Sequence, residues 1–158
     1  MQSNTITAVK ERDFTIVKNS PVHGRGVFAK KNIPKGTRII EYAGKRVLKK
    51  DIAADLLKGL TSLVYIMNLN EIMAIDAERD GNDARFVNHS CLPNCIVYFF
   101  NEVPYIYALR EIITGEELSF DYKMGFAEAE RQLSLELKKT FLPCCCGAAN
   151  CRGTLFNN

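Results

Sequence analysis

Four of the six cysteines in this 158-residue chain lie close together near its C-terminal end, as Cys144, Cys145, Cys146 and Cys151. Disulfide-bonded secreted proteins usually spread their cysteines along the chain, and residues 1–18 contain no apolar segment typical of a secretion signal. Structural zinc is held by four thiolate or imidazole ligands in a tetrahedron. Two of the three adjacent cysteines and Cys151 provide three such ligands. The pattern therefore predicts a zinc site, with disulfides or free thiols as the alternatives.

Two further segments have compositions that suit a binding site. Residues 81–95 (GNDARFVNHSCLPNC) mix small, polar and aromatic residues without a helical or strand period. Such a segment is typical of a loop held by its own side-chain hydrogen bonds, and such loops often carry function. Gly24 and Gly26 form a G-x-G pair, which allows either a tight turn or the close approach of a ligand to the backbone.

Short β-rich runs separated by glycine and proline turns dominate the elements that must position these residues. We expect strands at residues 14–17, 27–29, 37–42, 63–69, 72–75, 96–100 and 105–109, and another after a turn at Thr114-Gly115. Apolar residues recur at helical intervals in residues 49–60, which predicts an amphipathic helix. A second helix is expected at residues 127–140. The sequence therefore predicts a mainly β protein with one or two helices.

Composition and charge exclude several classes of protein. Hydrophobic residues make up 47% and charged residues 25% of the chain, as in an ordinary globular protein. No apolar run approaches the roughly 20 residues that cross a bilayer. The net charge of +3 and the absence of a basic stripe argue against direct sequence-specific binding of nucleic acid.

Five segments, in this order along the chain, resemble the signature motifs of the SET domain, the catalytic domain of histone-lysine methyltransferases. They are residues 23–28 (HGRGVF), 41–44 (EYAG), 81–95, 115–122 (GEELSFDY) and 144–153 (CCCGAANCRG). Lys45 departs from the pattern, because an acidic residue usually follows the second motif. The motifs are most similar to those of the trithorax and mixed-lineage-leukaemia type.

The resemblance implies the SET (β-clip) fold: several short sheets around a knot-like core, with a zinc-bound C-terminal tail. It implies a SET domain at residues 12–124 with a helical insert at 45–62, a helical connector at 125–142 and a post-SET tail at 143–158. The same resemblance supplies Cys91 as the fourth zinc ligand beside Cys144, Cys146 and Cys151. Cys145 stands where the family often has a polar residue near the cofactor, so the resemblance implies a cofactor contact at this position.

The implied activity is S-adenosylmethionine-dependent methylation of a protein lysine. Free lysine has a pKa near 10.4, so only about one side chain in a thousand is neutral at neutral pH and able to attack the methyl group. A narrow apolar channel and a nearby cationic sulfonium both lower that pKa. By resemblance Tyr122 is the catalytic tyrosine, and Tyr65 and Phe120 line the lysine channel. The implied cofactor contacts are His23, Gly24, Arg25, Gly26, Tyr65, Arg85, Asn88, His89, Tyr122 and Cys145.

The resemblance also implies the substrate and the setting. Phenylalanine at Phe120 implies di- or trimethylation, because tyrosine at that position is associated with monomethylation. The substrate is expected to be a histone H3 tail within a nucleosome, and the location the nucleus and its chromatin, those of a host cell if the protein is microbial or viral. A homodimer partner or an accessory subunit could complete the substrate groove. The alternatives are methylation of a non-histone protein and a non-catalytic, peptide-binding scaffold.

Overall fold

A computed structural model describes residues 13–125 and 135–157 of the chain. The N-terminal elements are strands β1 (Thr15–Asn19) and β2 (Arg25–Ala29), which pair antiparallel. Strand β1 ends and strand β2 begins at the turn formed by residues 19–24, in which Gly24 has a positive φ of 48°. The hairpin therefore holds the predicted G-x-G pair at the start of β2.

The central sheet contains three antiparallel strands in the order β3-β9-β8. These are β3 (Arg38–Glu41), β8 (Cys95–Phe100) and β9 (Val103–Ala108). In β9 the burial alternates, so that Ile106 is fully buried while Tyr105 and Tyr107 are partly exposed on the other face. This alternation is typical of a sheet with one face on the core.

The second three-stranded sheet has the order β4-β6-β5 and carries the first helix. Its strands are β4 (Lys45–Leu48), β5 (Ile66–Asn68) and β6 (Met73–Asp76). Helix α1 (Lys49–Leu57) follows β4, and the 3-10 helix η1 (Leu63–Tyr65) precedes β5. The prediction of a strand at residues 63–69 was wrong for its first three residues, and β4 was missed. The predicted helix is present but ends at Leu57, and no residue of it is buried.

The polar segment at residues 81–95 lies between the sheets. The 3-10 helix η2 (Asp83–Phe86) is capped by Asn82, whose side chain accepts a hydrogen bond from the amide of Ala84. The two-residue strand β7 (Asn88–His89) then pairs in parallel with β10 (Ser119–Phe120). This pairing brings the predicted cofactor residues beside the strand that leads to Tyr122.

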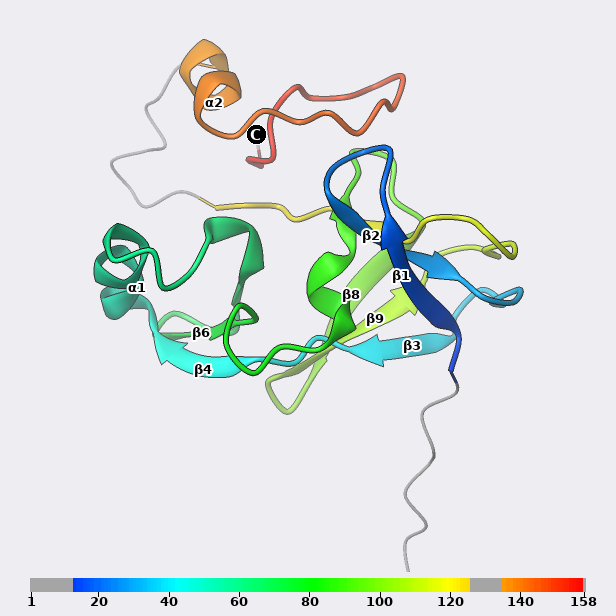
Figure 1. The fold of residues 1–158 in the computed structure, drawn as a ribbon, viewed down its shortest axis with the longest axis horizontal. Coiled ribbons are helices and arrows are strands. Elements are labelled where there is room, and N and C mark those ends of the chain that lie inside the picture. Colours follow the sequence, from blue (N-terminus) through cyan, green and yellow to red (C-terminus); the bar gives the residue numbers. More distant parts are fainter. Residues whose placement is uncertain (1–12, 126–134, 158) are drawn as a thin grey trace, which may run out of the picture.

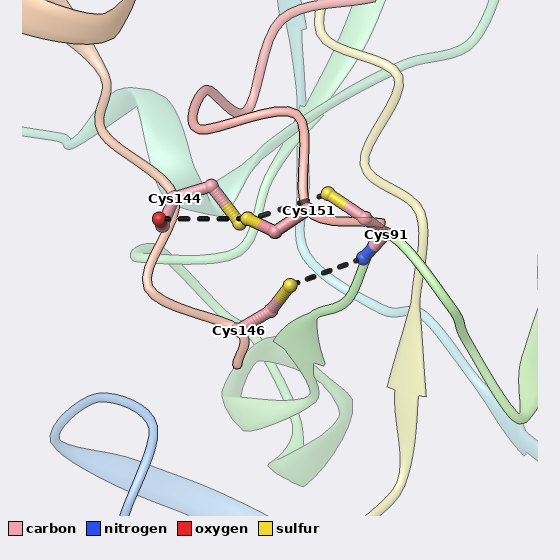
Figure 2. Close-up of side chains that lie close together, drawn as sticks. All are labelled: Cys91, Cys144, Cys146 and Cys151. Carbon is pink, nitrogen blue, oxygen red and sulfur yellow. Dashed lines mark hydrogen bonds between the residues drawn. The ribbon is translucent and has the colours of Figure 1, made fainter. Parts of the chain in front are cut away.

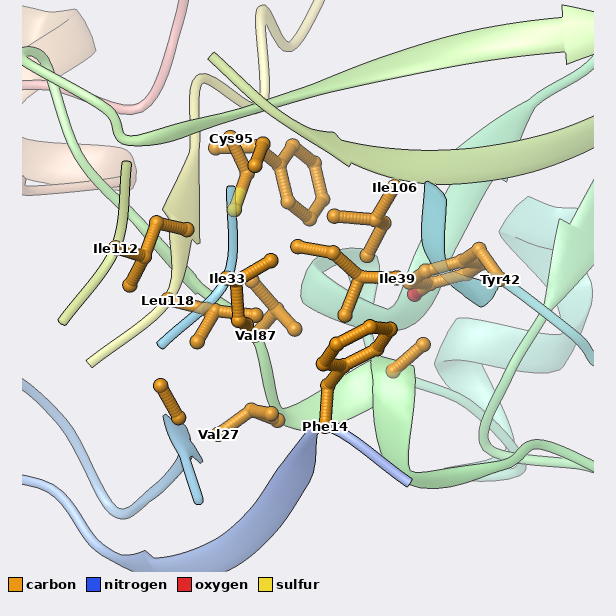
Figure 3. Close-up of a cluster of buried hydrophobic side chains, with 14 of the residues drawn as sticks. Phe14, Val27, Ile33, Ile39, Tyr42, Val87, Cys95, Ile106, Ile112 and Leu118 are labelled. Carbon is orange, nitrogen blue, oxygen red and sulfur yellow. The ribbon is translucent and has the colours of Figure 1, made fainter. Parts of the chain in front are cut away.

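The core lies between the central sheet and the N-terminal hairpin. Val27, Ile33, Ile106, Ile112 and Leu118 are fully buried. Figure 3 shows these side chains and Val87 pointing toward one another from separate segments. The prediction of a mainly β fold with several short sheets is confirmed.

The C-terminal tail lies with helix α2 (Leu135–Phe141) on one side of the molecule (Figure 1). Residues 127–134 of the predicted second helix lie outside the described residues. Isolated β-bridges join Met124 to Phe156 and Pro143 to Thr154. The tail therefore folds back along the segment that follows Tyr122. Within the described part of the chain, no helix is long and apolar enough to cross a membrane.

Candidate functional site

A cavity of about 440 Å³ lies between strand β5, the buried face of β8 and the segment after β10. Its apolar lining includes Val64, Ile66, Met67, Val97, Phe99 and Leu109. Its polar lining includes Tyr42 and Tyr122, and Phe120 closes the same wall. Asn68, Arg85, Asp121 and Lys123 also line the cavity. A mainly apolar cleft with several polar groups suits a long aliphatic side chain that ends in one polar atom.

Tyr122 is fixed at this wall from two sides. Its hydroxyl donates a hydrogen bond of 2.8 Å to the carbonyl oxygen of Val87, and its amide donates one of 3.1 Å to Nδ1 of His89. The rings of His89 and Tyr122 pack edge to face, with centroids 5.3 Å apart. Burial raises the pKa of Tyr122 above its ordinary value, and the neighbouring Tyr65 and Glu117 raise it further. The hydroxyl therefore stays protonated and keeps its lone pairs for accepting a hydrogen bond.

Tyr42 is a cavity residue to which sequence reasoning gave no role. It is 3% exposed, and its hydroxyl donates a hydrogen bond of 3.3 Å to the carbonyl oxygen of Tyr65. Burial raises its pKa as well, and Tyr122 and Tyr65 add to that shift. Its motif, EYAG, was recognised, but only the position of Tyr42 in the cavity reveals that its side chain faces the same space as Tyr122.

Phe120 contacts Tyr122, and Tyr65 contacts Tyr42. Phe120 is 7% exposed, and its ring centroid is 4.9 Å from that of Tyr122. The side chain of Tyr65 packs against the hydrophobic core, and its backbone carbonyl accepts the hydrogen bond from the Tyr42 hydroxyl. Phe120 and Tyr122 line the cavity, whereas Tyr65, the third predicted channel residue, packs against the core and is not among the lining residues.

The turn at His23–Arg25 lies beside Asn88. The Asn88 side-chain amide donates hydrogen bonds to the carbonyl oxygens of Arg25 at 3.0 Å and His23 at 3.3 Å. The carbonyls of this turn are therefore gathered on one small region, where they can accept hydrogen bonds from an ammonium group. The side chain of His23 is exposed.

Arg25 and Arg85 share one aromatic neighbour, since their guanidinium carbons lie 4.3 Å and 4.7 Å from the ring centroid of Phe86. Arg85 also donates a hydrogen bond of 3.2 Å to the carbonyl of Ala77 and lines the cavity. The structure thus places Arg85 on the side of Tyr42 and Tyr122.

Four sulfur atoms come together where the tail meets strand β7 (Figure 2). The Sγ atoms of Cys91, Cys144, Cys146 and Cys151 all lie within 4.8 Å of one another. A zinc–sulfur bond of about 2.3 Å gives a tetrahedron with edges of about 3.8 Å. The Sγ atoms of Cys91 and Cys144 are 3.8 Å apart and no pair is more than 4.8 Å apart, so the spacing of the four sulfurs is close to that of a four-thiolate metal site. Cys145 is exposed and outside the group.

Backbone N–H groups point at three of these sulfurs. The amides of Cys91, Arg152 and Gly153 lie 3.4–3.5 Å from the Sγ atoms of Cys146, Cys91 and Cys151 respectively. Such contacts stabilise the thiolate form that binds a metal ion. Nε2 of His89 lies 3.3 Å from the Sγ atom of Cys91, so the cluster also contacts the histidine that holds Tyr122. Burial lowers the pKa of His89 to about 4, with a further lowering by Arg152 that Asp121 opposes.

Comparison with known proteins agrees with this arrangement. The model of the SET domain family matches residues 24–123. The chain is 38% identical over 146 residues, or 86% of its length, to human "Histone-lysine N-methyltransferase 2B". It is 38% identical over 144 residues to "Histone-lysine N-methyltransferase, H3 lysine-4 specific" of Schizosaccharomyces pombe, and 35% identical over 150 residues to "Histone-lysine N-methyltransferase trithorax" of Drosophila virilis.

These alignments cover 86–89% of the chain but only 5%, 14% and 4% of the three relatives. The family match spans well over half of the chain and includes the glycine turn, Asn88, His89 and Tyr122. The chain belongs to the SET domain family.

Proposed function

We propose that the chain is an S-adenosylmethionine-dependent protein-lysine N-methyltransferase that acts on a histone H3 tail. The observation that carries this proposal is the position of Tyr122. Its hydroxyl lies at the wall of an apolar cavity, and its backbone is bonded to His89, next to Asn88 and the glycine turn. One surface thus offers room for a lysine side chain, and the adjoining one offers acceptors for an amino-acid ammonium.

S-adenosylmethionine, when bound, supplies a methyl group that is lost from sulfur as the lysine nitrogen forms its new bond to carbon. The chain's own contribution is to desolvate and aim the amine. The apolar walls favour the neutral form of lysine. Tyr122 has a raised pKa and therefore does not act as a base. Its lone pairs, and those of Tyr42, accept hydrogen bonds from the amine and orient it. The proton that the lysine ammonium loses on becoming the neutral amine passes to solvent.

We propose the following residue roles. Tyr122, Tyr65 and Phe120 form the lysine channel. The turn at His23–Gly26 contacts the cofactor together with Asn88 and His89, with Arg85 and Cys145 at its margins. We assign the SET domain to residues 12–124, the connector to 125–142 and the post-SET tail to 143–158.

The cysteine cluster is proposed to hold one structural zinc ion through Cys91, Cys144, Cys146 and Cys151. A closed set of four thiolates is typical of structural rather than catalytic zinc. Its dimensions and the backbone N–H groups directed at the sulfurs support this assignment. The zinc would pin the tail, whose residues Leu155 and Asn157 exchange backbone hydrogen bonds with Met124 of the cavity wall.

Histone H3 is proposed because the Schizosaccharomyces pombe relative is named as specific for lysine 4 of H3, and the other two relatives are named as histone-lysine methyltransferases. The same proposal includes a nucleosomal substrate and a location in the chromatin of the nucleus. It also includes completion of the substrate groove by a second copy of the chain or by an accessory subunit. Phe120 favours di- or trimethylation, because a phenylalanine leaves room beside the amine that a tyrosine hydroxyl would fill.

The deciding experiment measures transfer of labelled methyl groups from S-adenosylmethionine by the purified chain to H3 peptides and nucleosomes. Tyr122→Phe should lower the rate by about 100-fold or more while binding of S-adenosylhomocysteine persists. Tyr98→Phe removes the hydroxyl of a half-exposed tyrosine on β8 and is the matched control. Transfer only to other proteins would favour the non-histone alternative, and cofactor binding without any transfer would favour the scaffold.

A further inference from the structure

The carboxylate of Glu117 lies beneath the glycine turn and touches the groups that shape it. Its Oε1 atom accepts a hydrogen bond of 2.7 Å from the side-chain amide of Asn88 and one of 2.8 Å from the hydroxyl of Ser20. Its Oε2 atom lies 3.0 Å from the same hydroxyl. A β-bridge between Glu117 and Phe28 fixes the backbone from which this side chain projects.

Ser20 and Asn88, the two side chains that bond to Glu117, also form hydrogen bonds with the backbone of the turn. The Ser20 hydroxyl accepts a hydrogen bond of 2.9 Å from the amide of Val22, and the Ser20 amide donates one of 2.8 Å to the carbonyl of Gly24. Asn88 donates to the carbonyls of His23 and Arg25. One carboxylate therefore connects the two side chains that fix the backbone of the turn.

The same carboxylate explains why Gly26 is a glycine. A Cβ atom at this position would lie 2.2 Å from Oε1 of Glu117, far inside any normal contact distance. Gly26 has no left-handed backbone conformation, whereas Gly24 has a φ of 48° and open space around it. Gly24 therefore serves the turn, and Gly26 makes room for Glu117.

We infer that Glu117 is a positioning residue for cofactor binding, acting through Asn88 and Ser20 on the turn at residues 20–26. The inference rests on the proposed function, because it assigns S-adenosylmethionine to this turn. Hydrogen bonds to a carboxylate are stronger than those between neutral groups. A turn that is held before binding loses less conformational entropy when the ligand arrives. Glu117 thus raises cofactor affinity without touching the reacting atoms.

The test is calorimetric titration of the full chain with S-adenosylhomocysteine, together with steady-state methylation kinetics. Glu117→Ala should raise the Kd and the KM for the cofactor by about tenfold or more, while kcat at saturating cofactor changes less than about threefold. Glu116→Ala is the matched control. Its carboxylate bonds to Arg110 and Asn94 instead, so it should leave the Kd unchanged while lowering thermal stability.

Two further variants separate geometry from charge. Glu117→Gln keeps an oxygen at the Oε1 position for Asn88 and Ser20, so its Kd should stay within about threefold of the wild type. A Kd as high as that of Glu117→Ala would overturn the positioning role and point to direct attraction between the carboxylate and the cofactor. Gly26→Ala should raise the Kd less in the Glu117→Ala background than in the wild type, because the 2.2 Å clash with Glu117 is gone and only the 3.0 Å contact with Cβ of Ser20 remains. Additive effects would contradict the shared role.

Ser20→Ala tests the same network if Glu117→Ala does not fold, and it should raise the Kd by about threefold or more. If the wild-type chain binds no S-adenosylhomocysteine and transfers no methyl group, the proposed function fails and this inference fails with it. If the wild type binds and transfers, but neither Glu117→Ala nor Ser20→Ala weakens binding, only the inference is overturned.

Discussion

Arg152 of the cysteine-bearing tail forms a two-pronged ion pair with Asp121, the residue directly before Tyr122. Its two terminal nitrogens lie 2.9 Å and 2.8 Å from the two carboxylate oxygens. Both side chains are less than one-fifth exposed. Burial opposes ionisation of Asp121, but the hydrogen bonds from Arg152 and from the Lys123 amide hold its pKa below the usual value. The tail is thus fastened to the strand end that carries Tyr122.

Arg152→Ala should therefore disturb methylation more than its effect on stability alone explains. We expect the rate to fall by about tenfold, because the segment that carries Tyr122 loses its anchor, while the zinc content stays at one per chain. The measurements are methyl transfer to H3 and metal analysis. Arg110→Ala breaks a more exposed arginine–carboxylate pair, with Glu116, outside the cavity and is the control. Equal rate losses in both variants would contradict the prediction.

Removal of zinc should lower methylation as well as stability. A strong chelator, or Cys91→Ser, breaks the cluster that contacts His89, so Tyr122 loses the support of its amide partner. We expect the melting temperature to fall by about 5 °C or more, together with most of the activity. Cys145→Ser changes the exposed neighbour and should keep zinc and stability. Full activity in a chain shown to be free of zinc would mean that the cluster stabilises only the tail and does not support catalysis.

Phe120→Tyr should shift the product toward monomethyl-lysine. The added hydroxyl occupies space at the wall beside Tyr122 and can hold a water molecule near the amine. Mass spectrometry of H3 peptides over a time course reports the product states. Phe99→Tyr makes the same change elsewhere in the cavity and should leave the distribution unaltered. A wild type that makes only monomethyl-lysine would sink the prediction.

Tyr42→Phe should lower kcat by about tenfold, with the Kd for S-adenosylhomocysteine unchanged. The substitution removes the hydroxyl that bonds to the Tyr65 carbonyl and faces the cavity, but it keeps the buried ring. Tyr98→Phe again serves as the control for losing a tyrosine hydroxyl. If Tyr42→Phe matches the wild type in kcat, Tyr42 contributes packing alone.

The pair of Arg110 and Glu116 predicts a small dependence of stability on pH. Hydrogen bonding by Arg110 lowers the pKa of Glu116 below 4.5, against the effect of burial. A carboxylate with a lowered folded-state pKa stabilises the fold above its unfolded pKa and loses that contribution as the pH falls through the folded value. Arg110 is 57% exposed, so the contribution is at most about 1 kcal/mol.

Chemical denaturation at several pH values checks this sign. The difference in unfolding free energy between the wild type and Glu116→Gln should be largest near neutral pH and should shrink below about pH 4.5. Glu111→Gln removes an exposed carboxylate nearby and is the comparison. A difference that grows in acid would contradict the assignment.

Local patterns explain which elements could be predicted from the sequence. Strands β8 and β9 are rich in branched and aromatic residues, which predicts strands, but both sequences are apolar throughout and do not show which face is buried. Strand β4 was missed because KRVL is short, half polar and mostly exposed, and only its pairing with β6 makes it a strand. In helix α1 the apolar period is real, yet Leu57 is 91% exposed. Periodicity indicates a helix but not what covers its face.

The sequence motifs predict which residues belong to the candidate site, but not the contacts between one motif and another. The motifs placed Asn88, His89 and Tyr122 in one site. No spacing predicts that Arg152 pairs with Asp121 or that Glu117 lies against Gly26, because these contacts join residues 31 and 91 positions apart through the fold. Their geometry depends on the parallel pairing of β7 with β10, and strands of two residues are too short to be predicted from sequence.

The division of the cysteine cluster between Cys91 and the tail has a consequence for the order of folding. Cys91 and Cys144 are 53 positions apart, and closing such a loop costs about 3–4 kcal/mol of chain entropy. An unfolded chain therefore offers a metal ion the three nearby tail cysteines before the fourth. Tight coordination is completed only when strand β7 has docked beside β10. The rate at which the bound metal becomes resistant to a competing chelator then measures the rate of the last stage of folding. In that stage the chain reaches its final topology.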